Sequence, residues 1–390
     1  MIYLDNASTT KVDPRVLDAM MPFLTDQYGN PGSIHTIGKN ALCALNRARI
    51  QVADFIGAEP DQIIFTSGGT EANNLAIIGV LHDSDIRSIA VSRVEHDSIL
   101  RAIKRCNTGV NYIDVDSCCM VHPQLVRDVL KQNAGISSRG GIGFVSVMYV
   151  NNETGTINPV KQIADVCKEH GVLFHTDCVQ AAGCQHIDVN EIGCDFLSIS
   201  SHKIHGVKGV GALFVKDISK ISPLICGGAT QEFGLRGGTE NVAGIVGFGK
   251  ACEIAANERE EYKNTVLYYS KAFYEKLLNE LRANNLDNLI SINGSEQINC
   301  GKTMSIRVDG LDAETLVLMM DADGVCVSAG SACRSHESTP SHVLLAMGLT
   351  PEQARSSVRV SFSKFNTIEE IEKAACIMAG CIATLKSWWK

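Results

Sequence analysis

Three segments of the sequence carry side chains that could together bind a phosphorylated aldehyde. The first, Ser67-Gly68-Gly69-Thr70, places small residues between an apolar strand at 63–65 and an amphipathic run. Free backbone N–H groups at such a helix start, reinforced by a hydroxyl, form an anion site. Many turns of this kind bind nothing, and the segment matches neither a Walker loop nor the G-x-G-x-x-G pattern.

The second and third segments follow predicted strands. Asp177 comes after the apolar residues 172–174, at the edge where open α/β sheets form their ligand crevices, although an aspartate there could equally be a helix N-cap. Lys203 follows the strand at 196–199 and precedes a glycine-rich stretch at 206–211. A lysine in an apolar pocket can form a Schiff base with an aldehyde, whereas most lysines are solvated surface charges.

The combination of the three segments is more specific than any one of them. Pyridoxal phosphate requires a lysine for the Schiff base, a carboxylate for the pyridinium nitrogen and a cradle for the phosphate. The sequence offers these anchors in the order Gly69-Thr70, Asp177, Lys203. These residues therefore predict a pyridoxal phosphate site.

A separate candidate is Cys333, which lies among small residues at 328–335 and is followed by a polar stretch at 335–340. A mobile, exposed loop suits a thiol that has to travel, because the reactivity of a cysteine depends on access and on its thiolate fraction. The other fourteen of the 15 cysteines are expected to be small buried hydrophobic residues. No pair of C-x-x-C motifs and no H-E-x-x-H spacing occurs, so we predict no metal site.

The composition argues against several classes of protein. The chain has 390 residues, of which 45% are hydrophobic and 20% are charged, as is usual for a globular protein. Its formal net charge is −8 and it has no long basic run, which argues against direct nucleic-acid binding. No apolar run reaches the roughly 18 to 20 residues needed to cross a membrane. The start, MIYLDNASTT, lacks the features of a secretory signal, so we expect a cytoplasmic protein with reduced cysteines.

Short apolar runs alternate with amphipathic stretches, which is typical of βαβ units and of a mainly parallel sheet covered by helices. Strands are predicted at 63–65, 89–91, 110–115, 142–148, 172–174 and 196–199. We therefore expect a large doubly wound α/β domain over residues 15–255.

A second, smaller α+β domain is expected from residues 1–14 and 256–390. A long helical tract runs from Val242 to Leu281, and it is followed by a strand from Thr303, a helix from Asp312 and a strand at Val325. The small domain would carry the mobile cysteine loop at about 328–342.

Ten motifs spread over the chain occur in an order that is characteristic of one family. They are Tyr3-Leu4-Asp5-Asn6-Ala7, Tyr28-Gly29-Asn30-Pro31, Ser67-Gly68-Gly69-Thr70-Glu71, Glu95-His96, Val150-Asn151-Asn152-Glu153-Thr154-Gly155, Asp177 to Gln180, Ser201-His202-Lys203, Arg236-Gly237-Gly238-Thr239, Ser328 to Cys333 and Ser357-Val358-Arg359. In these motifs the chain resembles the pyridoxal-phosphate cysteine desulfurases of the NifS/IscS type, which are class V aminotransferases. The resemblance implies the aspartate-aminotransferase fold (fold type I), with a large cofactor domain, a small domain and a homodimer.

The resemblance also implies how the cofactor ring would be bound. Lys203 would form the Schiff base, and Asp177 would pair with the pyridinium nitrogen. Gln180 would hydrogen-bond the phenolic oxygen. His96 would stack on the face of the ring and assist proton transfer.

Further residues are implied for the phosphate and for the substrate. The phosphate would be held by small or polar residues of one subunit and by a threonine of the second subunit, namely Gly69, Thr70, Ser200, His202 and, across the interface, Thr239. Asn152 and Arg359 would position the carboxylate of the substrate, L-cysteine.

The implied activity converts L-cysteine to L-alanine and passes the sulfur, as a persulfide on Cys333, to an acceptor protein. The sequence is compatible with acceptors in iron–sulfur cluster assembly, tRNA thiolation and DNA phosphorothioation. Two other hypotheses are an aminotransferase or selenocysteine lyase, which would not need Cys333, and a non-catalytic binding protein, which should have lost Lys203 or Asp177. Cys178 and Cys326 have no functional explanation, and the end at Lys390 leaves docking of an iron–sulfur scaffold open.

Overall fold

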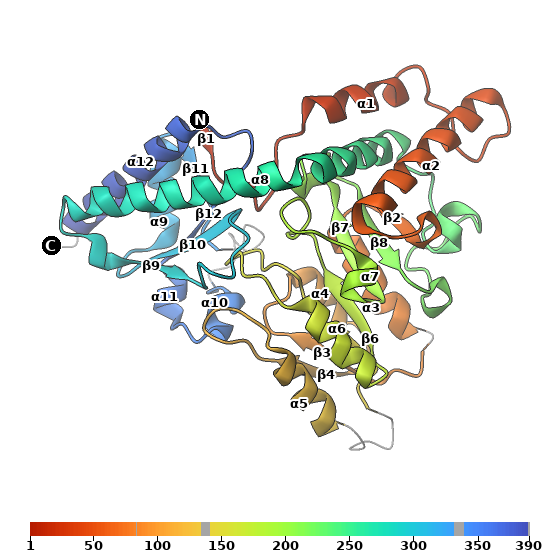
Figure 1. Cartoon of the computed structure of the whole chain (residues 1–390), viewed down its shortest axis with the longest axis horizontal. Helices are drawn as coiled ribbons and strands as arrows, with labels where there is room; N and C mark the ends of the chain where they lie inside the picture. Colours follow the sequence, from red (N-terminus) through yellow and green to blue (C-terminus); the bar gives the residue numbers. More distant parts are fainter. Residues whose placement is uncertain (83, 134–140, 331–338, 389–390) are drawn as a thin grey trace.

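The computed structural model describes residues 1–82, 84–133, 141–330 and 339–388 (Figure 1). The seven-stranded sheet in this part of the chain has the order β2-β8-β7-β6-β5-β3-β4. Its strands, in that order, are β2 (Ile63–Thr66), β8 (Gly211–Val215), β7 (Phe196–Ser200), β6 (Leu173–Asp177), β5 (Phe144–Ser146), β3 (Ser88–Ser92) and β4 (Gly109–Ile113). β8 is antiparallel to both of its neighbours, and the other neighbouring pairs are parallel. The mainly parallel α/β sheet is thus confirmed, and each predicted strand is present.

Helices cover this sheet because their apolar residues recur at helical spacing. In α2 (Thr36–Ile56), Ala41, Leu45, Ala48 and Val52 are buried on one face. The helix ends at Gly57, whose φ of 68° suits glycine. The other helices of this part are α1 (Pro14–Leu24), α3 (Gly69–His82), α4 (Asp97–Ile103), α5 (Pro123–Asn133), α6 (Val160–Glu169) and α7 (Val189–Ile192), with short 3₁₀ turns η1 (Pro60–Gln62), η2 (Ser201–Lys203), η3 (Ile218–Lys220) and η4 (Gln231–Gly234).

A second, antiparallel sheet has the order β12-β10-β9. Its strands are β9 (Ile290–Asn293), β10 (Thr303–Val308) and β12 (Ser357–Ser361), and the 3₁₀ turn η5 (Asp287–Leu289) precedes β9. Strand β1 (Ile2–Tyr3), at the N-terminus, pairs in parallel with β11 (Val325–Cys326). The surrounding helices are α9 (Ala313–Ala322), α10 (His342–Ala346), α11 (Pro351–Arg355) and α12 (Ile368–Trp388).

The long helix α8 (Val242–Arg282) extends along most of the length of the molecule in Figure 1. It packs against α1 and α2 beside the large sheet, and against α12 beside the small one. We propose that the two sheets with their helices form two domains, residues 15–255 and residues 1–14 with 256–390. The boundary near residue 256 then lies within α8, so one continuous helix joins the domains. No helix of the described residues is long and apolar enough to span a membrane.

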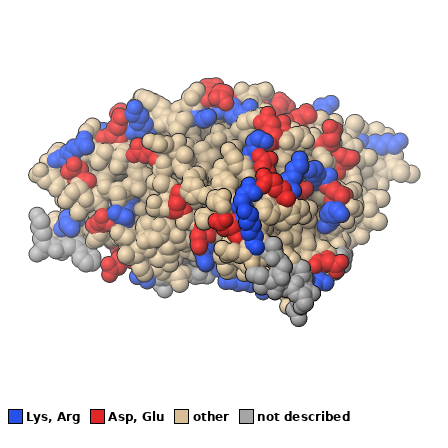
Figure 2. All heavy atoms as spheres, turned by 60° about the horizontal axis from the view of Figure 1, so that its bottom comes forward, with Lys and Arg blue, Asp and Glu red and all other residues tan. Residues whose placement is uncertain are grey.

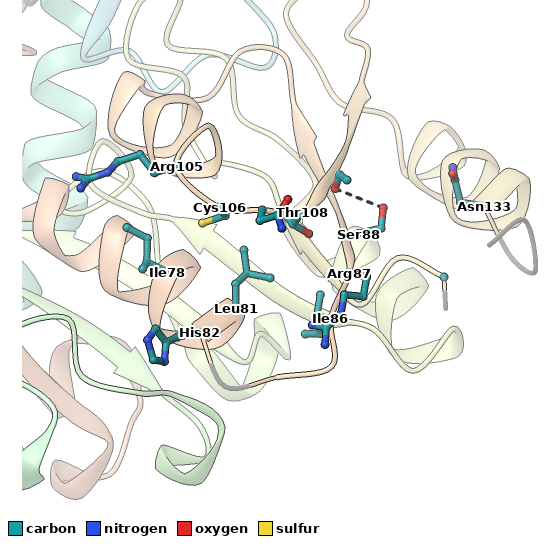
Figure 3. Close-up of a pocket in the computed structure, with 13 residues that line it drawn as sticks. Ile78, Leu81, His82, Ile86, Arg87, Ser88, Arg105, Cys106, Thr108 and Asn133 are labelled. Carbon is teal, nitrogen blue, oxygen red and sulfur yellow. Dashed lines mark hydrogen bonds between the residues drawn. The ribbon is translucent and has the colours of Figure 1, made fainter. Parts of the chain in front are cut away.

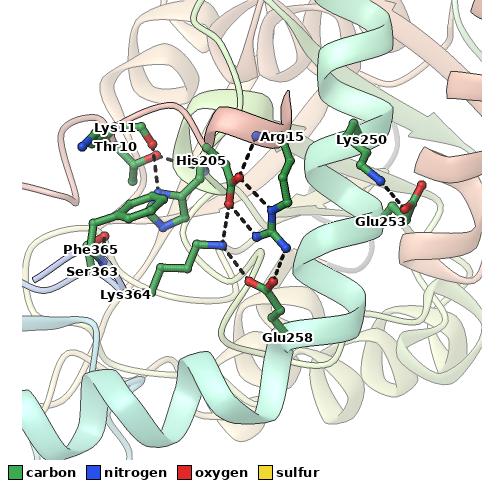
Figure 4. A network of polar contacts seen from close by, with 11 residues as sticks. Thr10, Lys11, Arg15, His205, Lys250, Glu253, Glu258, Ser363, Lys364 and Phe365 are labelled. Atoms are coloured by element: carbon green, nitrogen blue, oxygen red, sulfur yellow. Dashed lines mark hydrogen bonds and ion pairs between the residues drawn. The ribbon is translucent and has the colours of Figure 1, made fainter. Parts of the chain in front are cut away.

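A network of charged side chains ties two distant segments to this helix (Figure 4). Asp13 caps the N-terminus of α1 and is almost completely buried. Its carboxylate accepts hydrogen bonds from Arg15, at 2.7 Å, and from Lys364, at 2.9 Å. Glu258, on α8, accepts from the same two side chains, at 2.6 and 2.7 Å. The network therefore joins α1, α8 and the segment that follows β12.

We predict that Asp13→Asn lowers the free energy of unfolding by about 1 to 3 kcal/mol at pH 7, because the half-exposed Arg15 and the more buried Lys364 lose a buried, charged acceptor. The hydrogen bond from Arg15, followed by that from Lys364, holds the pKa of Asp13 well below its usual range. Its stabilisation is therefore complete above about pH 4, the unfolded pKa, and is lost as the pH falls further. Urea unfolding of both proteins between pH 7 and pH 3 measures this. The exposed Asp18→Asn on the same helix is the control, and equal stability of the two variants would contradict the prediction.

Candidate active site

A cavity of about 540 Å³ lies at the carboxyl ends of β6 and β7. Ten residues that the sequence singled out line this cavity, namely Gly69, Thr70, His96, Asn152, Asp177, Gln180, Ser200, His202, Lys203 and Arg359. Open α/β sheets bind their ligands at this edge, where the connecting loops converge. The fold therefore brings together side chains from segments that are far apart in the sequence.

Among the predicted residues that the structure describes, Thr239 is exposed and does not line the cavity of its own chain. Cys333 lies outside the described residues, and the described chain resumes at Thr339 after Gly330.

One end of the cavity has the features of an anion site. Helix α3 begins at Gly69, so its free N–H groups lie at the cavity wall. A Cβ on Gly69 would lie 2.7 Å from Val179 Cγ2, so glycine keeps this space open. The buried hydroxyl of Ser200 has no hydrogen-bond partner within the described residues. An unpaired hydroxyl beside a helix N-terminus fits a phosphate group.

His202 lies at the same end of the cavity, with its Nδ1 3.2 Å from the hydroxyl of Thr9. Burial, followed by the nearby positive charge of Lys203, lowers the pKa of His202 to about 3. The imidazole is therefore neutral at pH 7 and can donate one N–H to an anion.

A chain of hydrogen bonds runs from Asp177 to His96 along the cavity wall. Asn73 donates through Nδ2 to Asp177 Oδ2, at 2.7 Å, and to Ser98 Oγ, at 2.9 Å. Ser98 Oγ lies 2.8 Å from His96 Nδ1, which also accepts from the backbone N–H of Ser98. Because Nδ1 acts as an acceptor, Nε2 is the ring nitrogen of His96 that is assigned a proton. The chain holds Asp177 and His96 in fixed relative positions.

The amine of Lys203 lies beside the N-terminal segment of the chain. Its Nζ donates to the carbonyl oxygens of Ala7, at 2.5 Å, and Ser8, at 2.7 Å. Gln180 donates through Nε2 to the same Ala7 oxygen, at 2.9 Å, while its buried Oε1 has no partner among the described residues. An amine and an amide group thus face a cavity in which a ring-shaped cofactor could engage both.

Arg359, on β12, adds a buried cation to the lining of the cavity. Its guanidinium donates to Asp5 Oδ1, at 2.9 Å, to Ser8 Oγ, at 2.6 Å, and to the carbonyl of Asn152, at 3.0 Å. Arginine presents a planar set of donors that suits a carboxylate. The arrangement can therefore hold a small acid next to Lys203.

Several residues that complete the cavity were not predicted to be site residues. Asn73 and Ser98 line it, as do Ala7 and Ser8. Asn73 lies one helical turn after Thr70, and this spacing could have identified it. Ala7 and Ser8 accept hydrogen bonds from Lys203 through their backbone carbonyls, and such contacts cannot be predicted from the type of side chain.

A larger hollow of about 1000 Å³ lies at the opposite, amino ends of β3 and β4 (Figure 3). Its described lining includes Arg87 and Arg105 but no lysine and no carboxylate, so it lacks the groups for Schiff-base chemistry. A surface cluster of His186, Asp188 and Glu191 could geometrically hold a metal ion, but Asp188 already caps α7. Neither feature competes with the cavity around Lys203.

The profile of the aminotransferase class V family matches residues 2–374 of this sequence. The chain belongs to this family, whose members use pyridoxal phosphate. The anion site beside Gly69, the buried Asp177 carboxylate and the amine of Lys203 fit the phosphate, the ring nitrogen and the aldehyde of that cofactor.

The relatives of the chain indicate a more specific group within the family. It is 38% identical to "Cysteine desulfurase IscS" of Methanosarcina thermophila, over 99% of this chain and 93% of that protein. Among solved structures, a "NifS-like protein" superposes with a TM-score of 0.86 at 33% identity, covering 98% of this chain and all of the other. "SspA in complex with cysteine" has a TM-score of 0.80 at 32% identity, covering 94% of this chain and all of the other.

We predict that Gly211→Ala lowers the free energy of unfolding by about 1 to 3 kcal/mol, the usual range for overpacking. Gly211 begins β8 beside the turn that contains Gly68, and a Cβ there would lie 2.7 Å from both the carbonyl carbon of Gly68 and the oxygen of Ile199. The control is Gly380→Ala, since Gly380 is an exposed helical position in α12 with nothing within 4 Å of the new carbon. Urea unfolding should show the first variant destabilised and the second unchanged or stabilised.

Proposed function

We propose that this protein is a cysteine desulfurase, which converts L-cysteine to L-alanine and transfers the sulfur to an acceptor protein. The observation that carries this proposal is the single cavity that combines the amine of Lys203, the buried Asp177 and the guanidinium of Arg359. The full-length similarity to proteins named cysteine desulfurase supports the same conclusion.

In this proposal Lys203 binds pyridoxal phosphate covalently, and Asp177 pairs with its ring nitrogen. His96 covers the ring and Gln180 bonds the phenolic oxygen. The phosphate is held by Gly69, Thr70, Ser200 and His202, and by Thr239 of a second subunit. When bound, the cofactor acts as an electron sink for negative charge on the α-carbon of an amino acid.

The other groups of the cavity have roles toward the substrate. Arg359 and Asn152 hold the carboxylate of L-cysteine, so that its α-proton faces the amine of Lys203. Lys203 Nζ takes this proton and later returns one to the product. His96 Nε2 holds a second proton near the reacting atoms. Because Asp177 is buried and bonded to Asn73, it can keep the ring nitrogen protonated.

The sulfur itself is transferred to Cys333 in this proposal. The thiolate of Cys333 forms a bond to the substrate sulfur while the carbon–sulfur bond of the substrate breaks. Cysteine and one thiol thereby become alanine and one persulfide, and no external oxidant is required. An acceptor protein then takes the outer sulfur. Iron–sulfur cluster assembly, tRNA thiolation and DNA phosphorothioation remain its candidate destinations.

We further propose a homodimer in the cytoplasm. Large apolar side chains are exposed on and after α1, with Tyr28 73% and Ile34 90% exposed, and such surfaces are typical of subunit interfaces. A second subunit would also explain why Thr239 lies outside the cavity of its own chain. The fourteen described cysteines are all unpaired, as suits a reducing compartment.

We expect no direct nucleic-acid binding. On the face in Figure 2, basic and acidic side chains alternate without forming a continuous basic surface. The formal net charge of −8 has the same sign as a nucleic acid backbone.

We predict that Cys333→Ala loses at least about 99% of the sulfide released from L-cysteine in the presence of a thiol reductant, because the sulfur then has no nucleophile. The cofactor absorbance in the visible range should be retained. Sulfide and alanine are measured for the parent, for Cys333→Ala, and for Lys203→Ala, which should lose both the absorbance and the turnover. Unchanged turnover in Cys333→Ala would instead favour an aminotransferase or lyase.

We predict that Ile34→Asp shifts the protein from dimer toward monomer at micromolar concentration, since a charge would be buried at the interface. The matched control is Leu318→Asp, because Leu318 on α9 is 70% exposed and lies outside the proposed interface. Sedimentation equilibrium should give twice the chain mass for the parent and the control. A monomeric parent would contradict the homodimer.

A further inference from the structure

Lys302 is a lysine for which the proposed reaction has no role, yet it is only 1% exposed. It lies directly before β10, in the proposed small domain. Its Nζ donates a hydrogen bond to the main-chain carbonyl oxygen of Lys203, at 3.0 Å. Burying an ammonium group costs several kcal/mol unless good partners compensate for the lost water. A lysine at such a position therefore calls for an explanation.

The surroundings of Lys302 contain several ionisable groups. Burial is the largest effect on the pKa of Lys302 and lowers it. The thiols of Cys184 and Cys300 raise this pKa, whereas the positive charge of Arg359 lowers it further. A hydrogen bond from Cys184 lowers the pKa of Cys300, and the same contact raises the pKa of Cys184. The two thiols lie close enough to Lys302 to favour the charged form of its ammonium group.

The positive charge of Lys302 also acts on the turn that carries Lys203. After burial, it is among the causes that lower the pKa of both His202 and His205. Lys302 thus contacts the backbone of Lys203 and helps to keep the histidines on either side neutral. Both effects converge on the same short turn.

The sheet that carries Lys302 also carries Arg359. Thr303 pairs with Ser361 in β12, and Ser305 pairs with Arg359. The backbone N–H of Phe362 donates to the carbonyl of Lys302, at 2.9 Å. One sheet therefore presents Arg359 to the substrate side of the cavity and Lys302 to the back of the Lys203 turn.

We propose that Lys302 is a positioning residue for Lys203. By holding the carbonyl of Lys203, it fixes the point from which the Lys203 side chain enters the cavity, at a set separation from Arg359. The inference rests on the proposed role of Lys203 as the attachment point of the cofactor. It assigns a function to a residue that touches neither cofactor nor substrate.

The alternative is that Lys302 only fills space. Methionine has a similar volume and no charge, and replacing a buried charge by an apolar side chain of similar size is often neutral or stabilising. If Lys302 only fills space, Lys302→Met should leave the behaviour of Lys203 unchanged. If it positions Lys203, the variant should keep its stability and lose reactivity at Lys203.

The experiment measures how fast the apoprotein binds pyridoxal phosphate through Lys203. Pyridoxal phosphate is added to cofactor-free protein, visible absorbance is followed, and the adduct on Lys203 is trapped with borohydride and identified by peptide mass. We expect Lys302→Met to bind the cofactor at least about tenfold more slowly, because small misplacements of reacting groups are costly. Its thermal unfolding midpoint should be unchanged or higher. Lys302→Gln, which keeps an N–H donor, should recover part of the rate.

The matched control is Lys364→Met. Lys364 is a half-buried lysine that bonds Asp13 and Glu258 rather than Lys203. This variant should unfold at lower temperature and bind the cofactor at a rate within about twofold of the parent, because it loses an ion pair but no contact to Lys203.

Several outcomes would overturn the inference. Binding of the cofactor by Lys302→Met at the parental rate shows that Lys203 does not need the contact. If Lys302→Met does not fold, the Lys302→Gln variant is used instead. A folded Lys302→Gln protein that binds the cofactor at a near-parental rate supports the positioning role. If neither variant folds, the role of Lys302 is purely structural. A parent that does not bind the cofactor through Lys203 removes the proposed function, and this inference with it. The assay does not depend on sulfur transfer, so failure at Cys333 leaves the inference intact.

Discussion

The turn that carries Lys203 is held by segments from both halves of the chain, and the geometry of the site depends on this constraint. From the N-terminal side, Thr10 Oγ1 donates to the carbonyl of His202, at 3.0 Å. From the C-terminal side, Lys302 donates to the carbonyl of Lys203. His205 has a φ of 64°, which is uncommon for a residue other than glycine, and its ring is hydrogen-bonded to the carbonyl of Lys11. Surrounding contacts therefore maintain a backbone shape that the local sequence would not favour.

The charges of the cavity are arranged for an anionic ligand although the whole chain is acidic. Arg359 and Lys203 line the cavity, Lys302 lies behind it, and Asp177 is the buried carboxylate among them. His202 stays neutral because burial lowers its pKa. The site thus combines fixed positive charge, a neutral N–H donor and one buried carboxylate, which matches a molecule with a phosphate, a carboxylate and a protonated ring nitrogen.

The sequence predicted most of the fold and ten of the residues around the cavity. Most of the short apolar runs became strands whose residues are buried on both faces of a sheet covered by helices. Asp177 is the last residue of β6, and Lys203 follows β7. The strands predicted at 110–115 and 142–148 correspond to β4 and β5, which are shorter than predicted. An apolar run does not show at which residue the hydrogen bonding between two strands ends.

Other features of the site could not be predicted because they depend on tertiary contacts. Ala7 and Ser8 accept hydrogen bonds through their main-chain carbonyl oxygens, which every residue type possesses. Lys302 gives no local signal, because a lysine at a strand start is usually solvated and only the complete fold buries it. The sequence predicted a helical tract where α8 lies. That this one helix connects the two sheets is evident only from the complete fold.

The pairing of the two chain ends has a consequence for how the protein is made. β1 pairs with β11, Asp5 forms a bridge with Ser361, and Asn6 donates to the carbonyl of Ser361 at 2.9 Å. The residues at positions 7 to 10, which contact Lys203 and His202, therefore gain their final support only after about nine-tenths of the chain has left the ribosome. The large sheet can form earlier during translation, but the cavity is completed last. Cofactor incorporation is thus a late event that follows synthesis, and a chain truncated before β12 would leave an unfinished site.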